Sequence, residues 1–467
     1  MRTEGDHHQV SENVFNNLPA WEQEAWRALR DDFIGPYSEL ADTLAPHLSP
    51  EQRSQTEPRY KELTYIDGVD IAAVRSQLEN QPFFPFVRNY GESWHRVMEP
   101  GQFTRLFIYY LDMIVRNLRA GDHHMAAKAT GMVSHILCDQ HPGDHIDPGV
   151  WLRYILPPPD SIKDRLSDCW GITTQEVDIP RTSYRPQLLG LQPAEAMFHF
   201  YHRYLDMMKR GLPRISQMLL AVYAGQPAEA QRILSASRLM GIEIISDFIH
   251  TAFCIAYDRF DPAEKATLER VDLTRFTPLI SEMDYLYFHG PYTDGVVDFF
   301  ANGPLQPRKL EPELLVVPPG KTQPVLEVVR PVLAVLPDSG CANEKRWARL
   351  VYELPDGCFR RFTCLAGMPP RVCVRGRERG AQAAQFLNGQ GADLREQEVG
   401  RVAVRVLGDD QLLFERNPVM GGDPAVVIDV PLAGVKRLSL IVEGLHRNGG
   451  EFWLGHFVWG RPVLTKT

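Results

Sequence analysis

The sequence predicts a multidomain protein with an all-α N-terminal domain, residues 1–300, and an all-β C-terminal domain of jelly-roll sandwich type, residues 341–467. Apolar residues recur mostly at helical spacing from residue 20 to about 290, whereas short β-patterned runs follow residue 340. Between them, residues 301–340 carry prolines at spacings that no helix tolerates, so we expect a linker and an entering strand there.

Several segments of the N-terminal half have the periodicity and the end signals of helices. Residues 21–48 are expected to form one or two helices, and 102–121 a strong helix that ends at a glycine. The next, 122–140, begins at an Asp that can cap it. Two long helices, 193–225 and 227–258, each open with a proline near the first turn. The half is therefore expected to be nearly all helix.

The C-terminal part alternates short strand-like runs with turn residues. Regular spacing of such runs, with Gly, Asp and Pro between them, is typical of a β-sandwich. The expected strands lie in RWARLVYELP, CFRRFTCLAGM, RVAVRVLGDDQLLFER, AVVIDVPLAG, KRLSLIVEG and EFWLGHFVWGRPVL.

Composition excludes some classes of protein. Hydrophobic residues make up 44% and charged residues 23%, close to the average of soluble globular proteins. A net charge of -9 without a long basic run argues against a dedicated nucleic-acid surface. We expect no transmembrane segment, because no stretch of about 18 uninterrupted apolar residues exists, and the N-terminus shows no signal-peptide h-region.

The seven cysteines are scattered and include no CxxC pair. This pattern predicts neither a disulfide framework nor a thiolate zinc knuckle, and reduced structural cysteines are expected. Cys358 and Cys364 are close enough in sequence to pair if the protein meets an oxidising compartment.

The segment HILCDQHPGDH carries the strongest chemical signal. Residues four apart on a helix share a face about 6 Å apart, so His135 and Asp139 can point at one ion, and Pro142 and Gly143 can fold the chain back to bring in His145. Nitrogen and carboxylate ligands without thiolates suit catalytic Zn²⁺, whose bound water becomes a nucleophile near neutral pH. A histidine on such a helix can equally be a capping or core residue.

This run resembles the zinc-dependent phospholipase C family, whose pattern A-x-x-x-G-x-x-x-H-x-x-x-D-x-x-x-P-x-H is shared by single-strand-specific nucleases of the same fold. The matching positions, with the proline one residue nearer the Asp, are Ala127, Gly131, His135, Asp139, Pro142 and His145. The resemblance implies that His135 and Asp139 bind a first zinc ion, that Asp139 bridges two ions and that His145 binds another.

The same resemblance implies further ligands upstream. The family has a histidine before this helix, preceded by an aspartate. His95 is the best candidate for a metal ligand, and Asp67 or Asp70 for the catalytic acid; a surface histidine and turn aspartates are the ordinary alternatives.

The later part of the family pattern is not matched. A further HxxxE or HxxxD helix would follow soon after His145, yet residues 146–190 contain no histidine. His202 and Asp206 are substitutes with helical spacing, although His202 lies in an aromatic helix where core histidines are as common. A second possibility is the group Asp168, Cys169 and Glu176.

Two other observations leave the metal site open. Glu243, Asp247 and His250 line one side of a helix, as a polar stripe facing solvent or a neighbouring helix, or as ligands. The family also uses an N-terminal Trp and a nearby His; here only His7 and His8 are available, so a reduced or inactive site is an alternative.

The end of the chain resembles the NPCBM family, carbohydrate-binding modules attached to glycosidases and other secreted enzymes, over about residues 345–465. The matching features are a G-D-D turn between strands, the run DVPLAGVKRLSL and a closing element with Glu451, Trp453, Trp459 and Pro462. Stacking on an aromatic face and polar contacts would bind sugar, and the candidates are His446, Asn448, Glu451 and Trp453. The alternative is that Trp453 and Trp459 close the core.

Together these features predict a zinc-dependent phosphodiester hydrolase, with phospholipid favoured over nucleic acid, held near a glycan-bearing surface by its C-terminal module. One alternative is a non-catalytic adhesion protein with a degenerate metal site; another is a single-strand-specific nuclease. The compartment stays open, because the family precedent is export while no leader is visible.

Overall fold

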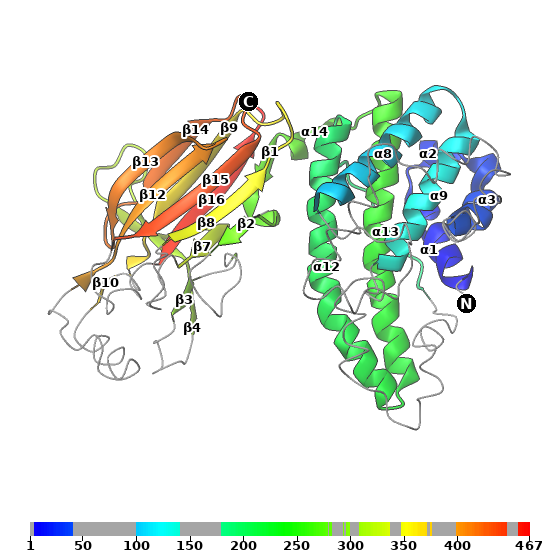
Figure 1. Ribbon diagram of the computed structural model, residues 1–467, viewed down its shortest axis with the longest axis horizontal. Coiled ribbons are helices and arrows are strands. Elements are labelled where there is room, and N and C mark those ends of the chain that lie inside the picture. Colours follow the sequence, from blue (N-terminus) through cyan, green and yellow to red (C-terminus); the bar gives the residue numbers. More distant parts are fainter. Residues whose placement is uncertain are drawn as a thin grey trace, which may run out of the picture. The chain divides into compact units, whose positions relative to one another are not determined.

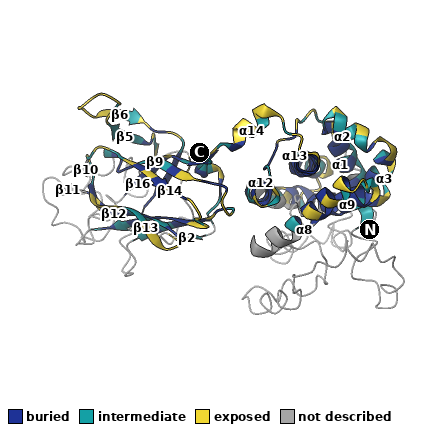
Figure 2. Ribbon diagram, turned by 90° about the horizontal axis from the view of Figure 1, so that it is seen from above, coloured by how far each residue is buried: buried dark blue, intermediate teal, exposed yellow. Residues whose placement is uncertain are grey.

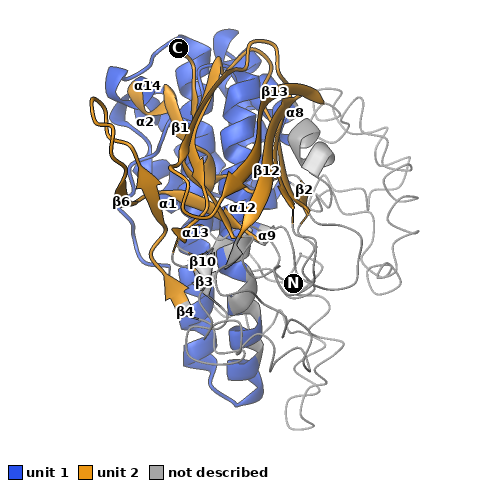
Figure 3. Cartoon of the chain, turned by 90° about the vertical axis from the view of Figure 1, so that its left-hand side faces the viewer, with its two compact units in different colours: residues 1–265 blue, residues 266–467 orange. Residues whose placement is uncertain are grey.

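The computed structural model describes residues 4–40, 100–140, 179–278, 280–282, 293, 296–298, 308–336, 347–370, 374–375, 398–445 and 456–467. The chain divides into two compact units, residues 1–265 and 266–467 (Figure 3). The first is helical in its described part and the second is built of β-sheets, in agreement with the predicted order of a helical and a β region.

The described helices of the first unit fall into short N-terminal segments and longer ones that follow (Figure 1). The N-terminal segments are α1 Glu4–Asn17, α2 Ala20–Ala25, η1 Arg27–Leu29, α3 Arg30–Ile34 and η2 Pro36–Glu39. The later helices are α8 Pro100–Arg119, α9 His123–Gln140, α12 Pro193–Tyr223, α13 Pro227–Tyr257 and α14 Pro262–Leu268.

Helix α13 forms the centre of this unit. It packs against α1, α8, α9 and α12, and almost every residue from Ile242 to Ala256 is buried. As expected, α12 and α13 begin with Pro193 and Pro227, whose fixed φ suits the first turn and whose missing N–H costs nothing there. By length and composition α13 could cross a membrane, but 89% of its most apolar window is buried, as in a core helix, so this is weak support for a span.

The second unit contains two five-stranded antiparallel sheets, which Figure 2 shows as two layers. In the first sheet the order is β1 Arg270–Asp272, β16 Phe457–Thr465, β9 Arg361–Gly367 and β14 Val426–Pro431, with β7 Val332–Val335 also pairing with β16. In the second the order is β13 Gln411–Met420, β12 Arg401–Gly408, β15 Arg437–Gly444, β8 Trp347–Glu353 and β2 Ile280–Glu282.

Three two-stranded ladders and one short helix complete the described part of this unit. The ladders are β3 Val296–Asp298 with β4 Arg308–Leu310, β5 Glu313–Val316 with β6 Val325–Val328, and β10 Val374–Arg375 with β11 Glu398–Val399. The short helix, η5 Leu273–Arg275, follows β1.

Alternating side chains of the sheets form a core. The buried positions of β12 are mainly valines, and Trp459 of β16 is fully buried. This alternation is the pattern expected of strands with one face turned inward. Of the two readings of Trp459, burial in the core is the one that the structure supports.

The division of the chain lies N-terminal to residue 300, the boundary that the sequence suggested. The reason is long-range pairing: β1 pairs with β16 and β2 pairs with β8, so residues 270–282 contribute to the β unit. The proline-rich stretch 301–340 contains β4 to β7, so its described part belongs to the β unit and is more than a linker. Cys358 and Cys364 are not joined by a disulfide in the structure, and their pairing in an oxidising compartment stays a prediction.

Candidate functional site

His135, the first predicted zinc ligand, lies on α9 with its side chain buried. Its Nδ1 lies 2.7 Å from the carbonyl oxygen of Ser38, and its ring stacks on that of His7 with centroids 4.0 Å apart. A carbonyl only accepts, so Nδ1 carries the proton, and in the neutral imidazole Nε2 is then the nitrogen with a lone pair. Histidines that bind metal usually have this arrangement.

Gly131, another residue of the same motif, has a packing role. A Cβ at this position would lie 2.2 Å from the carbonyl oxygen of Tyr37. Gly131 and His135 therefore both hold the segment Pro36–Glu39 against α9. The motif thus has a structural explanation beside the metal-binding one.

The other residues of the predicted centre are less defined. Asp139 belongs to α9, but its side chain is not described. The remaining predicted residues, Asp67, Asp70, His95 and His145, lie outside the described part of the chain. Their convergence with His135 stays a prediction.

His202 and Asp206, the predicted substitute pair on α12, have different surroundings. His202 is buried, with its ring 4.8 Å from that of Phe198. Asp206 is exposed and forms an ion pair of 3.0 Å with Arg210, one turn further along the helix. A shared ligand role for them stays a prediction, and these contacts do not support it.

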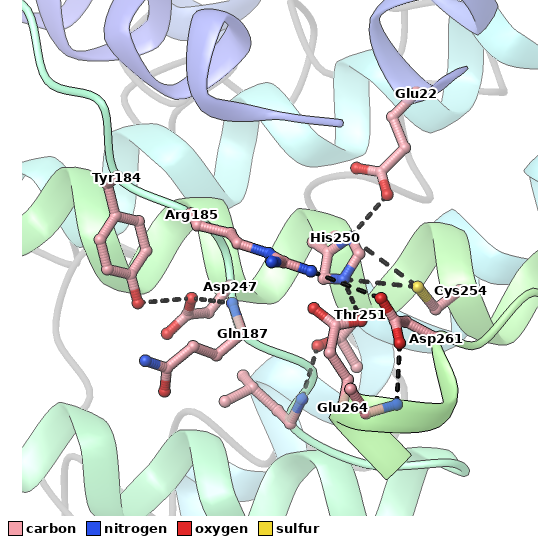
Figure 4. Close-up of polar contacts among 12 residues, drawn as sticks. Glu22, Tyr184, Arg185, Gln187, Asp247, His250, Thr251, Cys254, Asp261 and Glu264 are labelled. Carbon is pink, nitrogen blue, oxygen red and sulfur yellow. Dashed lines mark hydrogen bonds and ion pairs between the residues drawn. The ribbon is translucent and has the colours of Figure 1, made fainter. Parts of the chain in front are cut away.

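A different group of chemical side chains lies at a cavity of about 600 Å³ in the helical unit. His250 and Cys254 of α13 line this cavity together with Glu264 of α14 (Figure 4). Nδ1 of His250 lies 2.6 Å from Oε1 of Glu22, a fully buried residue of α2, and Nε2 lies 3.3 Å from Oε2 of Glu264. The Cys254 sulfur lies 3.8 Å from Nδ1 and 3.6 Å from Nε2.

The end of α13 explains why Glu264 faces His250. Asp258 follows the helix in the left-handed conformation, with φ of 50°, and the amide of Arg259 donates to the carbonyl of Cys254 at 3.0 Å. The Asp261 side chain then accepts from the amide of Ala263 at 2.8 Å, which caps α14. This tight reversal returns the chain beside the last turns of α13.

Burial and hydrogen bonding set the charges of this group. Burial raises the pKa of Glu22 to about 7, although the contact with His250 opposes the rise. Burial alone would lower the pKa of His250, but hydrogen bonds to Cys254 and Glu22 outweigh it and raise this pKa to about 11. Burial also raises the pKa of the Cys254 thiol. Without a bound ion the group is therefore an imidazolium beside a protonated thiol.

Asp247, one turn before His250, organises a second buried network. Its carboxylate accepts from Nη2 of Arg203 at 2.7 Å, from the hydroxyl of Tyr184 at 2.9 Å and from the amide of Gln187 at 2.7 Å. Burial raises the pKa of Asp247 to about 6 against the opposing effect of Arg203. The network ties residues 184–187 to α12 and α13, which is a structural role.

The sequence alone does not identify this site. Glu243, Asp247 and His250 were expected to form a polar stripe or ligands; in the structure Asp247 and His250 are buried and hydrogen-bonded. The spacing of His250 and Cys254, four residues apart on one helix, was the signal that could have pointed to them. Glu22 gave no signal, because glutamates on short helices are usually exposed.

The C-terminal unit has a recognisable relative. Residues 378–465 match the NPCBM/NEW2 domain family. The C-terminal region carries an NPCBM/NEW2 domain. The resemblance that the sequence suggested over about 345–465 is thus confirmed for the matched residues, whereas the phospholipase C-like assignment of the N-terminal region stays a prediction.

Solved structures similar to this chain are CBM51 modules. CBM51 from Clostridium perfringens GH95, in complex with methyl-galactose, is 14% identical with a TM-score of 0.26, and the match covers 42% of this chain and 99% of that one. Tandem CBM51 modules of Sp3GH98, the family 98 glycoside hydrolase from Streptococcus pneumoniae SP3-BS71, are 13% identical with a TM-score of 0.28. The match covers 42% of this chain and 47% of that one.

A third similar structure joins the M60 catalytic domain of Clostridium perfringens ZmpB to two CBM51 domains. It is 15% identical with a TM-score of 0.25, and the match covers 42% of this chain but 15% of that one. TM-scores this low carry no argument, so the domain assignment rests on the family match. No curated protein sequence matches the chain.

The predicted sugar-binding residues fall within the matched family range. His446, Asn448, Glu451 and Trp453 belong to the connection between β15 and β16, which lies outside the described residues. Their role stays a prediction.

Proposed function

We propose that this protein binds carbohydrate through its C-terminal unit. The observation that carries the proposal is the match of residues 378–465 to the NPCBM/NEW2 domain family. Two five-stranded sheets with a buried valine-rich core supply a rigid frame for the connections between strands. Binding residues are often placed on such connections, because a rigid scaffold fixes their position.

The connection between β15 and β16 is the proposed place of contact with sugar. An aromatic face there can stack on the apolar C–H face of a sugar ring, and neighbouring polar groups can bind its hydroxyls. The proposed groups are Trp453 for stacking and His446, Asn448 and Glu451 for hydrogen bonding.

Calorimetry of the full-length chain with free sugars tests this proposal. Galactose and N-acetylglucosamine are the first probes. We expect Trp453→Ala to weaken binding by about fivefold or more, since stacking on a tryptophan contributes on the order of 1 kcal/mol or more. Val427→Ala, at an exposed position of β14, is the control and should bind as the parent does. Equal binding by the parent and the Trp453 variant would exclude this contact site.

We further propose, as a second function, that the helical region is a zinc-dependent phosphodiester hydrolase with phospholipid head groups as favoured substrate. What supports it is the buried His135, whose Nδ1–H is held by the Ser38 carbonyl and whose Nε2 has the lone pair. His135, with Asp139 and His145, would hold Zn²⁺, which supplies an activated water when bound. The module would then raise the local concentration of substrate at a glycan-bearing surface.

Hydrolysis assays with added zinc test the second proposal. Release of phosphocholine from a phosphatidylcholine dispersion, lost in His135→Ala, is expected, and faster cleavage of single-stranded nucleic acid would favour a nuclease instead. Release of neither product would leave the non-catalytic adhesion protein as the remaining reading.

A further inference from the structure

Three side chains that zinc commonly binds meet at one point of the helical unit. They are Glu22 of α2 and His250 and Cys254 of α13, all buried, and one ligand atom from each lies within 4.8 Å of the other two. We propose that Glu22, His250 and Cys254 form a zinc site at the floor of the cavity in the helical unit. This site is independent of glycan binding and of the predicted centre at His135.

The three ligand atoms lie close enough to one another for a single ion to join them. With zinc bonds of about 2.0 Å to nitrogen or oxygen and about 2.3 Å to sulfur, ligand atoms in a tetrahedral site lie about 3.3–3.7 Å apart. Nδ1 of His250 is 3.8 Å from the Cys254 sulfur and 2.6 Å from the nearer Glu22 oxygen. An ion that replaces the proton between His250 and Glu22 requires the carboxylate to withdraw by less than an ångström and the Cys254 side chain, whose sulfur lies beside the ring, to rotate toward the ion.

The second carboxylate oxygen of Glu22 gives independent support. The residue is 0% exposed, and among the described residues no hydrogen-bond partner is present for its Oε2. An unsatisfied buried carboxylate oxygen is costly, and each such case in a folded protein calls for an explanation. A cation bound by both carboxylate oxygens of Glu22 supplies one.

Glu264 supplies the outer contact that metal-binding histidines usually have. With zinc on Nδ1, the Nε2–H of His250 donates to Oε2 of Glu264, which lies 3.3 Å away (Figure 4). Such a carboxylate fixes the tautomer and the orientation of the ring. His250, Cys254 and Glu264 also line the cavity of about 600 Å³, so the fourth position of the ion is open to water from it, as in catalytic zinc sites.

Binding leaves the charge of the group unchanged. With Glu22 ionised, the imidazolium and the thiol each release one proton when Zn²⁺ binds, so two positive charges leave and two arrive. The buried group therefore gains no net charge. This favours binding, because a low-dielectric interior penalises added charge.

A nucleophilic Cys254 activated by His250 is the rival interpretation, and zinc-dependent protection of the thiol separates it from the proposed zinc site. A sulfur lying along one ring N–H bond would be much farther from the other nitrogen. The Cys254 sulfur is almost equally distant from both, at 3.8 and 3.6 Å, so it lies beside the ring. Direct transfer of the thiol proton to either nitrogen is poorly aligned.

Cobalt substitution in the full-length protein tests the site. After treatment with EDTA and addition of one equivalent of Co²⁺, we expect a thiolate-to-cobalt absorption band in the near ultraviolet and the strong visible bands of a four-coordinate ion. The thiolate band should disappear in Cys254→Ser and persist in the matched control Cys358→Ser, which changes a buried cysteine of the other unit that forms no disulfide. It should also persist in His135→Ala, because the predicted centre contains no thiolate.

Zinc affinity and thiol protection complete the test. Glu264→Gln should lower zinc affinity by about 10–100-fold. In the unmodified protein, zinc should protect Cys254 from alkylation, as measured by peptide mass spectrometry. This measurement needs no variant and so does not depend on whether a variant folds. Absence of the thiolate band together with equal alkylation of Cys254 in zinc and in EDTA would overturn the proposal, and fast alkylation in both would favour the nucleophile.

Discussion

Replacing Asp247 by alanine should destabilise the helical unit strongly. The side chain is 0% exposed and accepts hydrogen bonds from Arg203, Tyr184 and the amide of Gln187. Removing one partner of a buried ion pair costs about 3–5 kcal/mol, because the remaining charge stays uncompensated. The Arg203 side chain is 31% exposed and regains some hydration, so we expect about 3 kcal/mol.

Asp206→Ala is the matched control for this prediction. Asp206 pairs with Arg210 on the same helix as Arg203, at 3.0 Å, but the two side chains are 57% and 49% exposed. Exposed pairs of this spacing contribute about 0.3–0.5 kcal/mol. Urea unfolding followed by far-ultraviolet circular dichroism, which reports mainly on helix, measures both changes. Equal effects of the two substitutions would refute the assignment of Asp247 as a buried link between segments.

Three further predictions concern the packing and charge of single residues. Trp459→Ala should cost about 3–5 kcal/mol, because the indole is fully buried in the β unit; tryptophan fluorescence during unfolding measures it. Gly131→Ala should cost about 1–3 kcal/mol, since its Cβ would lie 2.2 Å from the Tyr37 carbonyl oxygen, and the melting temperature of the helical unit checks this. His250 has a pKa raised to about 11 in the folded protein. In EDTA, its contribution to the free energy of unfolding is therefore complete below its ordinary pKa of 6.5 and is lost as the pH rises toward 11. Between about pH 7 and about pH 9 the stability should fall by about 1.4 kcal/mol per unit more than in the double variant Glu22→Gln/His250→Gln, which lacks both titrating groups, and parallel pH profiles would contradict this.

Local signals predicted the long helices and many strands, but they missed α1, and residues 21–39, expected within one or two helices, form short α-helical and 3-10 segments. Pro193 and Pro227 begin the two long helices, and alternating apolar residues give β12 and β15. The unit boundary could not be predicted in this way, because β1 and β2 join the β unit through pairing with β16 and β8, far along the chain. Such long-range pairs leave no trace in local periodicity.

The candidate sites show the same contrast between local sequence signals and long-range contacts. Spacing and resemblance identified His135, and the structure adds Gly131 and the Ser38 carbonyl as the reason for its orientation. The group around His250 was not predicted, because Glu22, which contacts His250, lies 228 positions away from it in the sequence. A local pattern on α13 showed a polar stripe, and only the packing of α2 against that helix makes it a buried cluster.

The C-terminal resemblance was predictable for a different reason. Turn and strand sequences such as the G-D-D turn at Asp409 and Asp410 reflect backbone geometry: both residues have positive φ, and the Asp409 side chain accepts from the amides of Lys436 and Arg437. Residues that a turn requires remain visible in sequence even where overall identity is low.

A glycan array probed with the full-length protein tests the central claim most directly. We predict saturable binding to a defined subset of glycans that a free sugar of the same terminal type inhibits. Cooperative unfolding of the β unit in the same buffer is the control that the protein is folded. If the folded protein binds no glycan on the array, the assignment of the C-terminal unit as a carbohydrate-binding module is contradicted.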